Sequence, residues 1–163
     1  MNIMAKRSGL AILALLLALG GLGIGLYSMI TPGVHRTYYD ERITAYTSTA
    51  EDSWYDIPDI SISFQVDIGE TVYFLFTCEA DLVATSGVVQ MTFGLIIDGT
   101  SITESQVVVG HNEGGSINTM KFSVALQYRV ASMTPALHTV VVETYRECGG
   151  SISNCILFVQ TYT

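Results

Sequence analysis

The sequence has few prolines, few cysteines and few basic residues. Its 163 residues include three prolines, three cysteines and one tryptophan, and only seven lysines and arginines stand against fifteen aspartates and glutamates. Because the basic residues are so few and form no patch, we expect no binding to nucleic acid or to anionic lipid headgroups. With so little proline, no low-complexity run and no convincing internal repeat, we expect one folded domain.

Catalytic and metal-binding motifs are also missing. The sequence contains no nucleophile elbow, phosphate loop or zinc-ligand spacing, and His35, His111 and His138 are far apart in the chain. No pair of catalytic carboxylates stands out either. We therefore predict no catalytic residues, no metal ligands and no cofactor, and we do not expect an enzyme.

Charged side chains are absent from one long stretch, Ser8 to Ile30. As a helix, its twenty-three residues are long enough to cross a hydrocarbon core of about 30 Å. The basic residues that precede it, Lys6 and Arg7, favour a cytoplasmic N-terminus. We expect a cytoplasmic tail over 1–7, a transmembrane helix (signal anchor) in the lipid bilayer over 8–30, a short linker over 31–36 and an extracellular domain over 37–163.

Two other interpretations of this segment stay open. A cleaved signal peptide has a similar basic start, but here the apolar run continues past the small residues that would mark a cleavage site. The start Lys6-Arg7-Ser8-Gly9, followed by Leu10 to Leu13, resembles the archaeal prepilin-type leader. That resemblance implies a peptidase cut between the basic residues and the apolar helix.

Beyond residue 30 the composition changes to acidic, aromatic and β-branched. All fifteen acidic and five basic residues lie there, which gives a net charge of −10. Apolar and polar residues alternate over most of this region with no helical pattern between them, as in strands with one buried face. We predict a single all-β domain, an antiparallel β-sandwich of the jelly-roll kind. About eight strands are expected, over 38–49, 60–68, 71–79, 88–97, 102–109, 120–130, 137–145 and 155–162.

Two of these strands alternate without a fault and should supply the core. The apolar residues of one stripe are expected to pack against those of the other: Ile62, Phe64 and Val66 against Phe122, Val124 and Leu126. Asp98-Gly99 and Gly69-Glu70 are expected to form the turns between neighbouring strands. The domain should therefore have one continuous core.

Parts of the domain resemble small jelly-roll recognition heads. The resemblance covers about two thirds of the outer domain and is carried by strand pattern over Asp56–Ile68, Gly69–Phe74, Leu137–Glu143 and Ile156–Gln160. The similar families are the complement-head and tumour-necrosis-factor-like domains and the phage-fibre tips. The resemblance implies a recognition module that is often trimeric, so a homo-oligomer is an open expectation, and no binding residue carries over.

The cysteines suggest one disulfide outside the cytoplasm. Cys148 and Cys155 flank a short glycine-bearing segment, so both are expected near the mouth of the last hairpin and are the favoured pair. Cys78 is left over on the apolar face of a strand, where a lone cysteine is ordinarily inert. A reducing habitat would leave all three as thiols.

Two loops are the candidate ligand contacts. One contains Trp54 and Tyr55 within an acidic cluster, and the other contains His111, Asn112 and Glu113 between glycines. The leading interpretation is a membrane-anchored recognition or adhesion module at the cell surface, which binds an extracellular protein or glycan. The alternatives are a structural subunit of a surface filament or coat and a small extracytoplasmic enzyme.

Overall fold

The computed structural model describes residues 34–47, 52–84, 87–113 and 118–163. These residues belong to one compact unit, Val34–Thr163. None of them lies in a helix long and apolar enough to cross a membrane. The transmembrane helix predicted over 8–30 lies outside the described residues and stays a prediction.

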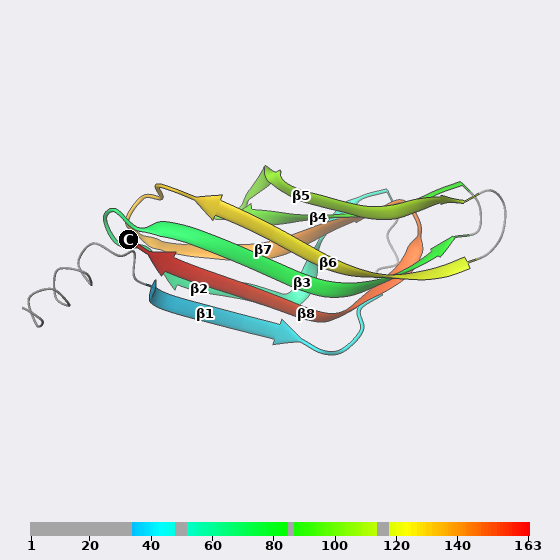
Figure 1. Ribbon diagram of the computed structural model, residues 1–163, viewed down its shortest axis with the longest axis horizontal. Coiled ribbons are helices and arrows are strands. Elements are labelled where there is room, and N and C mark those ends of the chain that lie inside the picture. Colours follow the sequence, from blue (N-terminus) through cyan, green and yellow to red (C-terminus); the bar gives the residue numbers. More distant parts are fainter. Residues whose placement is uncertain (1–33, 48–51, 85–86, 114–117) are drawn as a thin grey trace, which may run out of the picture. The chain divides into compact units, whose positions relative to one another are not determined.

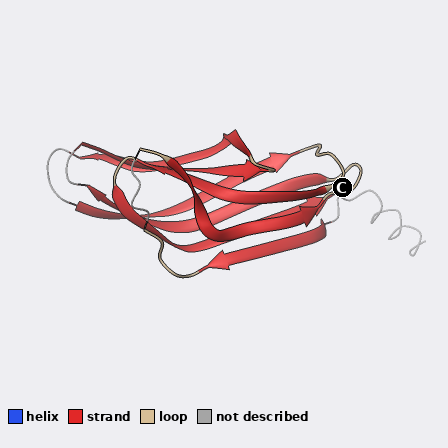
Figure 2. Ribbon diagram, turned by 180° about the vertical axis from the view of Figure 1, so that it is seen from behind, coloured by secondary structure: helices blue, strands red, loops and turns tan. Residues whose placement is uncertain are grey.

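Strands are the only regular secondary structure in the described part of the chain (Figure 2). Each pairs antiparallel to its neighbours, and the all-β prediction is confirmed. The strands are β1 (Val34–Arg42), β2 (Trp54–Gln65), β3 (Thr71–Ala84), β4 (Gly87–Ile97), β5 (Thr100–Glu113), β6 (Asn118–Val130), β7 (Leu137–Arg146) and β8 (Gly149–Tyr162).

The strands form two four-stranded sheets, ordered β1-β8-β3-β6 and β2-β7-β4-β5 (Figure 1). Within these sheets β4 pairs with β5, β3 with β6, β2 with β7 and β1 with β8. Such nested pairing is that of a long hairpin folded over on itself, which is the jelly-roll arrangement. Successive connections therefore alternate between the two ends of the sandwich.

The core lies between the sheets and includes the two predicted stripes. Ile62, Phe64 and Val66 are buried, as are Val124 and Leu126. Phe122 is only half-buried and packs at the margin of the core, because β6 is an edge strand and covers less of that side chain. Apart from this residue, the burial of the two stripes is confirmed, but their packing against each other is not: β2 lies opposite β1 and β6 lies opposite β5, at the two sides of the sandwich.

Two predicted turns are confirmed. Asp98 and Gly99 both have positive φ, 51° and 76°, and form the two-residue connection between β4 and β5. Their backbone twist matches that of the strands they join. Gly69, with φ of 84°, turns the chain between β2 and β3 and places Glu70 just before β3.

The strand boundaries differ most from the prediction at β1, β2 and β8. The first strand spans Val34–Arg42 and not 38–49, and β2 starts at Trp54, six residues before the predicted Ile60. An irregularity between Asp56 and Ser61, with Asp59 at φ of 61°, breaks the alternation that would have shown β2 in the sequence. The last strand starts at Gly149, because residues 149–153 pair with β3.

Candidate binding surface

The predicted ligand loops come to one end of the sandwich. β1 begins and β8 ends at the opposite end, which we call the terminal end (Figure 1). At the other end, which we call the far end, β1 and β5 end and β2 and β6 begin. Trp54 and Glu113 thus share an end of the fold. This placement could not be deduced from the sequence, because it depends on strand order.

Trp54 and Tyr145 form an aromatic pair on the outer face of the β2-β7-β4-β5 sheet. They are cross-strand partners, their ring centroids lie 5.5 Å apart, and 43 % of Trp54 is exposed. Burial raises the pKa of Tyr145, and the carboxylates of Asp52 and Glu147 raise it further, so its hydroxyl stays a hydrogen-bond donor at neutral pH. The pair offers aromatic surface to a ligand.

Tyr55 belongs to a different group of side chains. Its ring contacts that of Tyr46 edge-on at 5.9 Å, and the Arg42 guanidinium lies 5.3 Å from the centre of the Tyr46 ring. Because successive residues of a strand point to opposite faces, Tyr55 faces away from Trp54. Only one of these two predicted contact residues therefore lies on the outer face.

The second candidate loop is mostly strand. His111 and Asn112 belong to β5 and pair with Val89 and Val88 of β4, and Glu113 ends the strand. β5 and β2 are opposite edges of the same sheet, so His111 lies more than about 14 Å from Trp54 across three strand spacings. The structure brings the two candidates to one end but not into one site.

A buried carboxylate lies beside the aromatic pair and was missed by the sequence analysis. Glu143 is the next outward residue of β7 after Tyr145, yet only 5 % of it is exposed. It extends over Gly94, where an added Cβ would lie 3.2 Å from its Oε1 and 3.4 Å from Cγ of Gln106. It accepts a hydrogen bond from the Ser101 hydroxyl. An isolated glycine within the β4 pattern was the sequence signal for this close approach.

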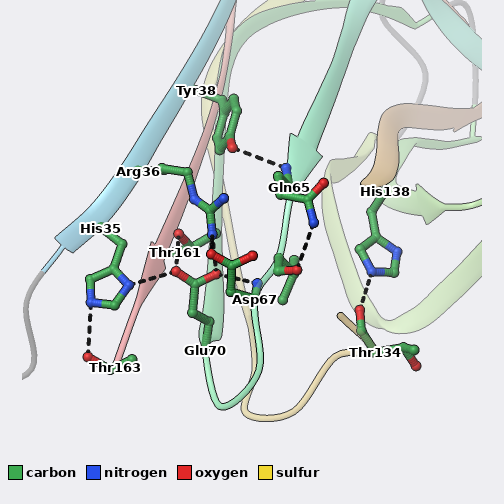
Figure 3. A network of polar contacts seen from close by, with 11 residues as sticks. His35, Arg36, Tyr38, Gln65, Asp67, Glu70, Thr134, His138, Thr161 and Thr163 are labelled. Carbon is green, nitrogen blue, oxygen red and sulfur yellow. Dashed lines mark hydrogen bonds and ion pairs between the residues drawn. The ribbon is translucent and has the colours of Figure 1, made fainter. Parts of the chain in front are cut away.

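Figure 3 shows a second polar cluster, at the terminal end, centred on Glu70. Only 1 % of this side chain is exposed. Its Oε1 accepts hydrogen bonds from His35 Nδ1 at 2.7 Å and from the Thr161 hydroxyl at 3.2 Å. Its Oε2 accepts from Arg36 Nη2 and from the Asp67 backbone N–H, each at 2.7 Å. Glu70 therefore joins the start of β1, the β2–β3 turn and the end of β8.

These bonds keep Glu70 ionised. Burial raises the pKa of a carboxyl, but the hydrogen bonds from Asp67, His35 and Thr161 and the charge of Arg36 outweigh it. The net pKa of Glu70 is lowered. The cluster is thus a satisfied ion network that holds three chain segments together, and it has the character of a structural site.

His138 forms a similar network nearby (Figure 3). Its Nδ1 lies 2.6 Å from Asp98 Oδ2 and its Nε2 lies 2.7 Å from the Thr134 carbonyl oxygen. Since both neighbours are acceptors, both ring nitrogens donate and the imidazole is charged. Burial lowers the pKa of His138, but the bonds to Asp98 and Thr134 raise it more, and the net pKa is raised. His138 lies in β7, within the strand predicted over 137–145.

Side chains of β1 close one open edge of the sandwich. The Gln65 backbone N–H donates to the Tyr38 hydroxyl at 3.0 Å, and the Ser61 N–H donates to Asp40 Oδ2 at 2.9 Å. Both N–H groups lie on the free edge of β2. Unpaired N–H groups on such an edge could donate hydrogen bonds to a strand of another chain, and the side chains of β1 occupy them instead.

Arg42 continues this series. Its Nη1 donates to the Pro58 carbonyl at 2.8 Å and to Asp59 Oδ2 at 2.7 Å. At the opposite side of the sandwich, no side-chain hydrogen bond joins residues 100–110 of β5 to residues 119–130 of β6. One pair of edge strands is therefore sealed and the other is not.

The predicted disulfide between Cys148 and Cys155 is not formed. All three cysteines are buried, and no disulfide is present among the described residues. The segment between the pair, Gly149–Asn154, is strand and not a hairpin loop. An extended chain of seven residues separates the two Cα atoms by about 20 Å, whereas a disulfide needs less than about 7 Å.

The described residues contain no group of three or more histidines, cysteines or acids that could hold a metal ion. The acidic residues around Trp54 spread along β2 and do not converge. Asp59 is bonded to Arg42, and Asp56 lies beside Glu143 in the strand register. Glu51 lies outside the described residues.

No family model matches the chain, and no curated protein matches it. Among solved structures it is similar to the CBM36-1 domain of a multidomain xylanase from the hindgut metagenome of Trinervitermes trinervoides. That match has a TM-score of 0.35 and 10 % identity, over 76 % of this chain and 96 % of that one.

Two further structures are similar at the same level. The infectious bursal disease virus Gx strain structure has a TM-score of 0.37 and 16 % identity, over 80 % of this chain and 33 % of that one. The globular domain of zebrafish complement 1qA has a TM-score of 0.33 and 10 % identity, over 77 % and 94 %. Scores and identities this low assign the chain to no family.

Proposed function

We propose that this protein is a membrane-anchored recognition module whose β-sandwich lies outside the cell and binds a saccharide without turning it over. The anchor would be the apolar segment 8–30, with Lys6 and Arg7 on the cytoplasmic side. The observation that carries the proposal is the exposed Trp54–Tyr145 pair beside the buried carboxylate of Glu143. Both stand on the outer face of one sheet.

The spacing of these groups suits a sugar ring. Tyr145 and Glu143 are two positions apart on β7, a distance of about 7 Å along the strand. A pyranose stacked on the Trp54 ring could therefore extend a pair of hydroxyls to the Glu143 carboxylate. The Gln106 side chain, next to Gly94, and the Thr92 hydroxyl, in register with Tyr145, add polar groups to the same face.

A binding experiment tests this proposal. The domain 34–163, which has its own core, would be screened on immobilised glycans and then titrated with the best ligand. We expect Trp54→Ala and Glu143→Gln each to weaken binding at least about tenfold, as for loss of a stacked ring or a charged hydrogen-bond acceptor. Tyr39→Ala is the matched control, because Tyr39 is an exposed aromatic residue on the other sheet.

Three outcomes separate the alternatives. Equal binding by the Trp54 and Tyr39 variants would refute the site. Shortened glycan in the mixture, detected by mass spectrometry, would favour the enzyme interpretation. If the domain binds a protein and Trp54→Ala abolishes that binding, the proposed binding surface is correct but its ligand is a protein and not a saccharide.

The proposed topology has its own test. Protease added to intact cells should remove the region after Thr31, because the positive charge lies before the apolar segment. A protected C-terminus, with digestion only after lysis, would contradict the extracellular placement.

One observation favours the second candidate, a subunit of a surface filament or coat. β5 and β6 are edge strands, and over residues 100–110 and 119–130 they lack side-chain bonds like those that seal β1 and β2. A neighbouring copy could add a strand there. Shearing cells and sedimenting the filaments would decide: protein in the pellet, and not in the membrane, supports the filament subunit.

A further inference from the structure

We propose that Cys78 and Cys155 form a disulfide when the domain folds outside the cytoplasm. This bridge would replace the pairing predicted from the sequence. It would cross-link β3 and β8, the two central strands of the β1-β8-β3-β6 sheet.

The strand register places the two cysteines opposite each other. Thr77 pairs with Ile156 and Glu79 pairs with Ser153, so Cys78 is the single β3 residue facing Asn154 and Cys155. Neighbouring residues across an antiparallel pair have Cα atoms about 4.5–5.5 Å apart. Natural disulfides have Cα separations of about 4.4–6.8 Å.

Both side chains point into the core, because Cys78 continues the buried alternation of Phe76 and Cys155 continues that of Leu157. Asn154 has φ of 51°, and this left-handed residue supplies the extra position of a β-bulge. Cys78 and Cys155 are both buried in the core cluster, and their thiols are hydrogen-bonded to each other. That bond and burial raise the pKa of Cys78, which keeps its thiol protonated and unreactive in the reduced, folded domain.

Cys148 is engaged elsewhere. Its thiol lies 3.8 Å from the Gln90 carbonyl oxygen at the far end of the sandwich. The strand between it and Cys155 keeps the two sulfurs far apart. Cys78 is therefore the thiol that can reach Cys155 without movement of the backbone.

The reaction is a two-electron oxidation. Each thiol loses one proton and one electron, one S–S bond forms, and the electrons reduce a disulfide oxidant, such as oxidised glutathione or a protein disulfide, to two thiols. Because the folded core covers both sulfurs, we expect exchange to occur during folding and not afterwards. The bridge encloses roughly 75 residues, which in the chain-entropy model corresponds to a melting-temperature increase on the order of 10 °C.

The test has two parts, both on the full chain. First, producing cells are lysed into acid and alkylating reagent, and the non-reduced protein is digested and analysed by mass spectrometry. Second, reduced protein in detergent is unfolded and refolded in a mixture of reduced and oxidised glutathione. We expect the peptide with Cys78 linked to that with Cys155, and Cys148 alkylated, in both samples.

Two serine variants and the alternative outcomes complete the design. Cys148→Ser should keep the bridge and the higher melting temperature, whereas Cys78→Ser should leave Cys148 and Cys155 as thiols and lower it. A Cys148–Cys155 link, or three alkylated thiols after refolding with glutathione, would overturn the proposal. If the cellular sample contains three thiols and the refolded sample contains the bridge, the proposal is wrong for the producing cell. Neither readout depends on a bound ligand.

Discussion

At the terminal end of the sandwich charged groups are buried and bonded to one another, whereas the far end presents an aromatic pair to solvent. Glu70 accepts four hydrogen bonds from three chain segments. Trp54 has one aromatic neighbour and 43 % of it is exposed. The first arrangement fixes the chain, and the second leaves surface for a partner.

The two ends should respond differently to the loss of a side chain. A buried ion network contributes little net stability when it is complete, but the loss of one member leaves the others buried without partners. Exposed aromatic surface behaves in the opposite way, because its removal costs the fold little. Substitutions at the two ends should therefore separate stability from binding.

The largest effect is expected at Glu70. Glu70→Ala would leave the Asp67 N–H, His35 and Arg36 without their acceptor, and should lower the free energy of unfolding by about 3 kcal/mol. Glu70→Gln, which keeps one acceptor, should cost less. Urea unfolding of residues 34–163 measures both. A loss below about 1 kcal/mol for the alanine variant would mean that the network does not hold this end.

A smaller effect is expected from pH, again at the terminal end. The raised pKa of His138 stabilises the fold fully below its unfolded value, and this contribution is lost as pH rises through the folded value. The lowered pKa values of Glu70 and Asp98 act oppositely, so stability is also lost as pH falls through their folded values. The unfolding free energy should therefore peak between these limits.

Asp98→Asn provides the control for this pH dependence. It removes the charge that faces His138. The decrease in unfolding free energy on the alkaline side should therefore become smaller by about 1 kcal/mol. On the acid side, the contribution of Asp98 should be lost and that of Glu70 should remain. An unchanged alkaline side would show that His138 is not charged in the folded domain.

The smallest effect on stability is expected at the far end. Trp54→Ala should change the free energy of unfolding by less than about 1 kcal/mol, because much of its side chain is already in water. The comparison between the two ends would fail if this variant unfolded as readily as Glu70→Ala.

The strands and the core were predictable from the sequence because alternation reports burial directly. The unbroken patterns of β2 and β6 and the Asp98-Gly99 turn located most of the fold. The errors occurred where the backbone departs from regular pairing. The Gly149–Asn154 segment has the composition of a hairpin loop, yet it is strand, and Gly150 permits this: an added Cβ would lie 2.2 Å from the Asp81 carbonyl oxygen.

The sites were less predictable because they depend on contacts between distant segments. Glu70 follows a glycine in a turn, where an acidic residue is ordinarily solvated, and its partners come from the two ends of the domain. Glu143 is buried because Gly94 leaves room for it. Gly94 lies on the paired strand β4, which β5 and β6 separate from β7 in the sequence. Local pattern carries no signal for the Glu70 contacts, and for Glu143 its one signal is the isolated Gly94. Trp54 was a candidate from the sequence, whereas its partner Tyr145 was not.

The strand directions determine how the domain would respond to mechanical tension. A pull between Trp54 and Val34 runs along β1, so the backbone bonds from β1 to β8 and the side-chain bonds from β1 to β2 would bear the load together, in shear. Bonds loaded in parallel must fail together, whereas bonds loaded in series open one at a time. Tethered at Val34 and held at its far end, the sandwich would resist a steady pull far better than its thermal stability implies.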